Sequence, residues 1–107
     1  MNVVTNDNIK TTAAVAALQQ VYDPEIGLNV VDLGLIYELD FDNEHKQILC
    51  TMTLTTQFCP MGESITSGVK SALKSTFPDY DVELSLIFEP AWKYEMISEE
   101  GKQFLNR

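Results

Sequence analysis

The stretch from Leu54 to Glu63 holds the residues with the clearest potential for chemistry. Cys59 follows an alternating apolar run that predicts a strand, and Pro60 comes directly after it, at the start of a helical pattern. Proline is favoured in the first turn of a helix, so Cys59 is expected at or beside an N-cap. The positive end of the helix dipole favours a thiolate there, and a thiolate can ligate a metal or attack an electrophile.

A structural interpretation of Cys59 stands beside this chemical one. Glu63 places a carboxylate in the same first turn, where it competes for the helix dipole. Free cysteine is also among the most buried residue types, so Cys59 could simply pack the junction between strand and helix. The residues of this stretch leave both interpretations open.

Other polar residues lie near the expected ends of elements and could converge on Cys59. They are the Asp23 and Glu25 pair, Asp32, and the threonines Thr53, Thr55 and Thr56. For the carboxylates the alternative is a turn or cap residue with a solvated head, and strand propensity accounts for the threonines. The single histidine, His45, falls in a polar turn, so a Cys–His catalytic pair is not supported.

Composition narrows the classes of partner. The 107 residues include 16 acidic and 7 basic side chains, and the formal net charge of -9 repels nucleic acid and anionic membrane surfaces. The apolar run at 13–18 is far shorter than the roughly 18 to 20 residues that span a bilayer, and the N-terminus lacks a basic start. We therefore expect a cytoplasmic protein whose partners are proteins, cations or small molecules.

Hydrophobic patterning predicts a single α+β domain over residues 1–107. Helical spacing predicts helices over about 8–21 and 61–76, and alternation predicts strands over 33–42, 47–54 and 82–88. Ser98, followed by two glutamates, predicts the cap of a short terminal helix. The order helix, strand, strand, helix, strand, short helix indicates two layers, with helices on one face of a small mixed three-stranded sheet.

Individual positions carry further expectations. The first helix is expected to bury Ile9, Ala13, Ala16, Ala17, Leu18 and Val21. Cys50 alternates with apolar residues of its strand and is expected in the core. Gly68 within the second helix suggests close approach to a neighbour, and Gly27 is free to take a positive φ angle.

Several ordered motifs resemble those of the iron–sulfur cluster assembly domain family. They are Asp23-Pro24-Glu25, Val31-Asp32-Leu33-Gly34-Leu35-Ile36-Tyr37, Thr53-Leu54-Thr55 leading to Cys59-Pro60, and Pro90-Ala91-Trp92. The resemblance extends from about Val21 to Leu105. The family includes bacterial SufT, the PaaD protein of phenylacetate degradation and eukaryotic iron–sulfur targeting factors. PaaD-type members carry an extra cysteine-rich C-terminal segment, whereas this chain has no cysteine after Cys59, so it looks more like the free-standing SufT kind.

The resemblance implies an α+β fold and a role in maturing iron–sulfur proteins without enzymatic turnover. Cys59 matches the family's reactive cysteine and is the implied metal ligand. The implied binding site is completed by the matching motif positions Asp23, Glu25, Asp32 and Thr55. Iron or an iron–sulfur cluster would be held transiently, and the implied partners are assembly or carrier proteins and client apoproteins.

Clusters are generally held by four thiolates, and one chain offers only Cys59 in a suitable position. A cluster would therefore need a homodimer bridged by two Cys59 side chains, carboxylate oxygens or an external thiol. Two alternatives stay open: a metal-free adaptor that docks carriers and clients through the Asp23 to Leu35 loop and Trp92, and a PaaD-like accessory protein for an aromatic-ring oxygenase. A thiol enzyme with Cys59 as nucleophile ranks last, since His45 is expected in a distant turn.

Overall fold

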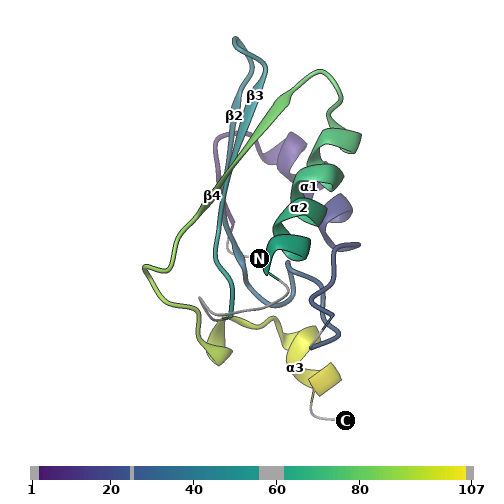
Figure 1. Ribbon diagram of the computed structural model, residues 1–107, viewed down its shortest axis with the longest axis vertical. Coiled ribbons are helices and arrows are strands. Elements are labelled where there is room, and N and C mark those ends of the chain that lie inside the picture. Colours follow the sequence, from purple (N-terminus) through teal and green to yellow (C-terminus); the bar gives the residue numbers. More distant parts are fainter. Residues whose placement is uncertain (1–2, 25, 56–61, 106–107) are drawn as a thin grey trace.

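The computed structural model describes residues 3–24, 26–55 and 62–105 (Figure 1). Within these ranges the strands are β1 (Val4–Thr5), β2 (Ile36–Asp42), β3 (Gln47–Met52) and β4 (Asp81–Leu86). The helices are α1 (Asn8–Leu18), α2 (Gly62–Thr76) and α3 (Glu99–Leu105), and a 3₁₀ turn, η1 (Tyr94–Met96), precedes α3.

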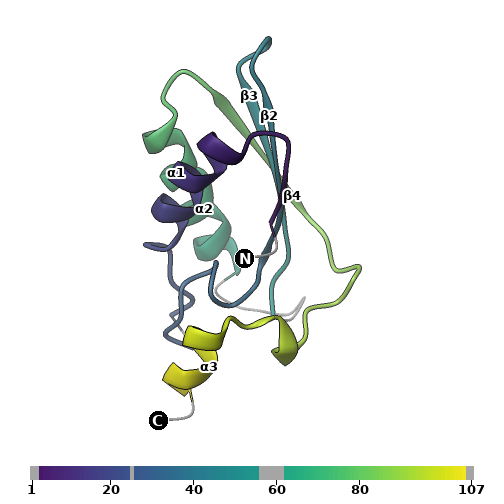
Figure 2. The same ribbon diagram turned by 180° about the vertical axis from the view of Figure 1, so that it is seen from behind.

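The strands form one mixed sheet in the order β1-β2-β3-β4. Strands β2 and β3 pair antiparallel, while β1 with β2 and β3 with β4 pair parallel. Helices α1 and α2 lie on one face of this sheet, and α3 lies at one end of the molecule beside the segment that joins α1 to β2 (Figures 1 and 2). The predicted α+β fold is confirmed. The predicted strand number was wrong, because β1 has only two residues and is too short for alternation to appear.

Helix α1 begins where the sequence predicts but ends at Leu18, before Val21. Asp7 is its N-cap, and the Asp7 carboxylate accepts a 3.0 Å hydrogen bond from the Lys10 N–H. The predicted buried face was largely wrong, since Ile9 is 86% exposed. Ala13 and Ala16 are also exposed, and the buried residues are Thr11, Ala14, Val15 and Leu18.

The buried face of α1 was mispredicted because threonine is a polar residue, so Thr11 was not counted among the buried positions. Its Oγ1 shares a 2.6 Å hydrogen bond with Oγ1 of Thr5, so the hydroxyl is satisfied in a buried position. Once Thr11 is accepted as an inward residue, the buried set has ordinary helical spacing.

A register shift explains why Ile36 interrupts the alternation of β2. Ile36 pairs with Met52 and Glu38 pairs with Thr51, so two steps along β2 match one step along β3. This bulge turns Ile36 toward the core, where it is 5% exposed. Strand β2 starts at Ile36, three residues later than predicted, and β3 ends at Met52 instead of Leu54.

The core forms between the sheet and the two long helices. Strand β3 and helix α2 bury the faces that their patterns predict, namely Ile48, Cys50 and Met52, and Ile65, Val69 and Leu73. The predicted close approach at Gly68 is confirmed, because a Cβ built there would lie 3.0 Å from Cγ1 of Val21. Cys50 is fully buried, as predicted, and this burial raises the pKa of its thiol to about 12.

Strand β4 is shorter and less covered than its pattern suggests. It ends at Leu86, whose side chain is 41% exposed, because β4 is an edge strand. The terminal helix α3 is confirmed, and its cap is Ser98, whose Oγ accepts the N–H of Gly101 at 3.0 Å. Across the described ranges, no helix has the length and apolar character needed to cross a membrane.

Candidate functional site

Asp23 lies in a tight turn directly after α1. Its N–H donates to the carbonyl oxygen of Leu28 at 2.9 Å, and its own carbonyl oxygen accepts the N–H of Gly27 at 2.8 Å. Gly27 has the positive φ angle expected from the sequence, 86°. Asp23 is only 2% exposed and is therefore a buried acidic residue. Glu25, the second acidic residue of the motif, lies outside the described residues.

Asp32 sits in a second turn, where both of its carboxylate oxygens accept hydrogen bonds. Oδ2 accepts from Nδ2 of Asn29 at 2.7 Å, and Oδ1 accepts from Oγ of Ser98 at 2.9 Å. The Asp32 N–H donates in return to Oδ1 of Asn29 at 2.9 Å. Asp32 thus joins its own turn to the start of α3, a contact that sequence reasoning did not anticipate.

The threonine motif follows β3. Thr53 is fully buried, and its N–H donates to the carbonyl oxygen of Leu35 at 2.9 Å. Thr55 is half-buried, and the described chain resumes at Gly62, the first residue of α2. The end of β3 and the start of α2 lie toward the end of the molecule at which α3 is found (Figure 1). Cys59 falls within the segment 56–61, outside the described residues, so its predicted place at an N-cap stays a prediction.

The segment that follows β4, the tail, is hydrogen-bonded to the 31–37 segment. Nε1 of Trp92 donates to the carbonyl oxygen of Leu33 at 2.6 Å, and the Trp92 ring packs partly buried against the core. The Tyr37 hydroxyl donates to the carbonyl oxygen of Pro90 at 3.0 Å. Burial raises the pKa of Tyr37, and a hydrogen bond with Thr53 acts in the opposite direction.

Gly34 completes this attachment. Its φ angle is 78°, and a Cβ built on it would collide with the carbonyl oxygen of Met96 in η1. A side chain at position 34 would therefore push the tail away. The motif residues of the 31–37 segment and of the 90–92 segment thus hold each other, and their signal in the sequence was glycine and tryptophan in otherwise irregular stretches.

His45, the single histidine, lies away from the acidic turns. His45 is exposed in the hairpin between β2 and β3, where its Nδ1 lies 2.8 Å from Oδ2 of Asp42. This placement confirms the expectation of an exposed turn histidine. Among the residues that the structure describes, no group of three or more His, Cys, Asp or Glu side chains could hold a metal ion.

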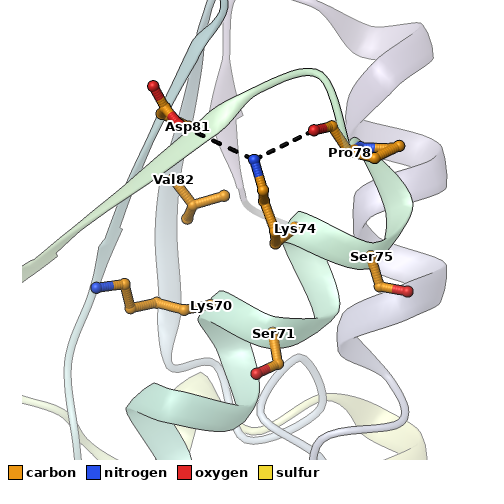
Figure 3. Close-up of a pocket in the computed structure, with 7 residues that line it drawn as sticks. All are labelled: Lys70, Ser71, Lys74, Ser75, Pro78, Asp81 and Val82. Atoms are coloured by element: carbon orange, nitrogen blue, oxygen red, sulfur yellow. Dashed lines mark hydrogen bonds and ion pairs between the residues drawn. The ribbon is translucent and has the colours of Figure 1, made fainter.

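A shallow pocket of about 520 Å³ lies between the C-terminal half of α2 and the start of β4 (Figure 3). Lys70 and Lys74 both line it, and Nζ of Lys74 donates to the carbonyl oxygens of Pro78 at 3.1 Å and Tyr80 at 2.8 Å. Asp81 lies 3.9 Å from the same nitrogen. Lys74 therefore satisfies backbone carbonyl groups just beyond the C-terminus of α2. The residues that line the pocket lie in the C-terminal half of α2, in β4 and, in the case of Pro78, between the two, and none of them belongs to the sequence motifs.

The fold and these motifs define a class of protein. The sequence profile of the family described as "Iron-sulfur cluster assembly protein" matches residues 11–85. The chain belongs to this family. The match includes both acidic turns and the segment that contains Cys59, whereas the Pro90-Ala91-Trp92 motif lies beyond its end.

Particular relatives agree with this assignment. The chain is 43% identical to a Fe-S protein maturation auxiliary factor of Porphyromonas gingivalis, over 81% of this chain and 82% of the relative. It is 39% identical to the Fe-S protein maturation auxiliary factor SufT of Staphylococcus aureus, over 77% of this chain and 92% of that protein. Among solved structures, a domain of unknown function, DUF59, from Bacillus anthracis is similar with a TM-score of 0.83 and 35% identity, covering 89% of this chain and 90% of that one.

Proposed function

We propose that this chain is an auxiliary factor in the maturation of iron–sulfur proteins and that Cys59 transiently holds iron or a cluster as cargo. The observation that carries the proposal is its 39% and 43% identity to two proteins named Fe-S protein maturation auxiliary factors, over most of each chain. The similarity of fold to the Bacillus anthracis domain supports it further.

The order of elements suits a thiolate at Cys59. Cys59 belongs to the connection, residues 53–61, between the end of β3 and α2, which begins at Gly62. The positive end of a helix dipole stabilises an anionic sulfur, and a thiolate is the form that binds iron. One thiolate is an incomplete ligand set, which suits release of the cargo better than storage. A second copy of the chain, a client or a small thiol would complete it.

In this proposal the acidic turns shape the site. The backbone of Asp23 is hydrogen-bonded within the turn that follows α1, and Asp23 is 2% exposed. Thr55 lies between the end of β3 and the segment that contains Cys59. The partners are carriers and client apoproteins, the place of action is the cytoplasm, and the chain transfers cargo without turning over a substrate.

A second candidate is a metal-free adaptor that docks carriers and clients. It is favoured by the use of both Asp32 oxygens within the fold, by Asn29 and by Ser98. The Asp23 to Leu35 loop and the Trp92 surface would then be the docking elements. The role of an accessory protein for an aromatic-ring oxygenase stays an untested prediction.

Maturation of an apo-ferredoxin tests the proposal. The client is supplied with iron, sulfide and thiol under anaerobic conditions, and its cluster is followed by visible absorption with and without the chain. Wild type and Cys50→Ala are expected to accelerate maturation, and Cys59→Ser is expected not to. Cys50→Ala is the matched control, because Cys50 is a core thiol.

The outcomes separate the candidates. Equal acceleration by Cys59→Ser and wild type would exclude the carrier and favour the adaptor. No acceleration by wild type would contradict both forms of the proposed function. Circular dichroism of each variant shows that its fold is intact.

A further inference from the structure

A continuous set of contacts runs from Asp32, through α3, to the turn that contains Asp23. It begins at Ser98, whose N–H donates to the carbonyl oxygen of Asp32 at 2.7 Å and whose Oγ donates to Oδ1 at 2.9 Å. The same Oγ accepts the N–H of Gly101 at 3.0 Å. A hydroxyl can donate one hydrogen bond while it accepts another, so Ser98 ties Asp32 directly to the first turn of α3.

Helix α3 in turn lies against the residues that close the Asp23 turn. A Cβ built at Gly101 would lie 3.3 Å from Cδ1 of Leu28, so the helix backbone approaches Leu28 closely. A Cβ built at Gly27 would lie 3.9 Å from the ring of Phe104. The backbones of Gly27 and Leu28 both hydrogen-bond to that of Asp23, as does the N–H of Ile26. Both views of the ribbon place α3 beside this segment (Figures 1 and 2).

We propose that Asp32 is a positioning residue that acts through Ser98 to dock α3 on the Asp23 turn and thereby fixes the backbone of that turn at the candidate site. The role of that site in maturation rests on the function proposed above. The competing role for Asp32 is direct contact with cargo or partner. The two roles differ in one respect: positioning requires Ser98, whereas direct contact does not.

Amide hydrogen exchange on the full chain, followed by NMR, tests the coupling without any assay of function. The variants are Ser98→Ala, Ser98→Thr and Asp32→Asn, with Ser75→Ala on the exposed side of α2 and Asp40→Asn on β2 as matched controls. The reporting amides are those of Asp23 and Gly27, which are hydrogen-bonded within the turn.

Loss of the Ser98 hydroxyl is expected to accelerate exchange of both reporting amides by about tenfold or more, since a hydrogen bond to a charged acceptor is lost. Ser98→Thr keeps the hydroxyl and should exchange like wild type, as should both controls. Unchanged exchange at Asp23 and Gly27 in Ser98→Ala would overturn the proposal. If Asp32→Asn fails to fold, the Ser98 pair of variants still decides the question.

The ferredoxin assay adds a functional readout. Ser98→Ala and Asp32→Asn are expected to lose maturation activity to the same degree, and Ser98→Thr to restore it. Full activity of Ser98→Ala beside an inactive Asp32→Asn would assign Asp32 to direct contact and overturn the positioning role. Inactive wild type would contradict the proposed function alone, because the exchange experiment tests the coupling independently.

Discussion

Nε1 of Trp92 and the carbonyl oxygen of Leu33 form a 2.6 Å hydrogen bond between residues 59 positions apart. This bond brings together two motifs that are separate in the sequence and attaches the tail to the segment before β2. The tail then reaches Ser98, which binds Asp32. The acidic turns are therefore supported by the C-terminal segment and not only by their own local structure.

Replacement of Trp92 by phenylalanine tests this attachment. Trp92→Phe keeps most of the packed ring but removes the N–H, leaving the carbonyl oxygen of Leu33 without its donor. We expect the free energy of unfolding to fall by about 1 to 2 kcal/mol in urea titrations. Tyr94→Phe, in an exposed position of η1, should change it by less than about 0.5 kcal/mol. Equal stability of Trp92→Phe and wild type would contradict the role of this bond.

Two glycines with positive φ angles give a matched pair. Gly27→Ala should cost only the backbone strain of a side chain at positive φ, about 1 to 2 kcal/mol. A Cβ at this position meets no atom closer than 3.9 Å, so no collision adds to that cost. Gly34→Ala adds a collision with the Met96 backbone, so we expect a loss of at least about 3 kcal/mol. Thermal and urea unfolding measure both. A similar loss in the two variants would show that the tail does not press on Gly34.

The sequence was sufficient to predict the main helices, the hairpin and the core faces of β3 and α2, because periodicity reports burial directly. It failed for α1, where a buried threonine is satisfied by another hydroxyl, and for β2, where a bulge changes the face of Ile36. It also missed β1, which has only two residues.

The sequence selected candidate site residues by their motifs but did not indicate the contacts of those residues that the structure describes. Asp23 and Asp32 were selected by motif, but the motif did not indicate that Asp23 is buried or that Asp32 accepts a hydrogen bond from Ser98, 66 residues away. Such contacts arise from tertiary packing, which a single sequence does not encode in local spacing. The cap pattern at Ser98 predicted a helix start but not its partner.

The Cys50 thiol makes stability depend on alkaline pH. Its pKa is about 12 in the fold against an ordinary value of 9.0, so the unfolded chain loses this proton first. Its contribution is complete below pH 9 and declines toward pH 12, by at most about 1.4 kcal/mol per pH unit. Urea unfolding of wild type and Cys50→Ala should show a constant difference at pH 7 to 8 that narrows above pH 9. A difference that stays constant up to about pH 11 would contradict the buried thiol.

The N-cap of α1, Asp7, makes stability depend on acid pH, because its pKa is lowered in the fold. Hydrogen bonds from the Lys10 backbone and side chain hold the pKa of Asp7 below its ordinary value of 3.8. The stabilisation is therefore present above pH 3.8 and is lost as the pH falls through the lower folded value. Asp7→Asn retains a capping oxygen without the charge. Thermal midpoints should differ most near neutral pH and converge in acid, and parallel curves would argue against the charge effect.

Anaerobic reconstitution with iron and sulfide tests the central claim most directly. Wild type, Cys59→Ser and Cys50→Ala are reconstituted side by side, and each is analysed by visible absorption and by iron and sulfide content per chain. The account predicts that wild type and Cys50→Ala bind iron or cluster and that Cys59→Ser does not, with the iron content showing whether two chains share one site. Equal binding by Cys59→Ser, or no binding by wild type, would contradict the claim that Cys59 carries the cargo.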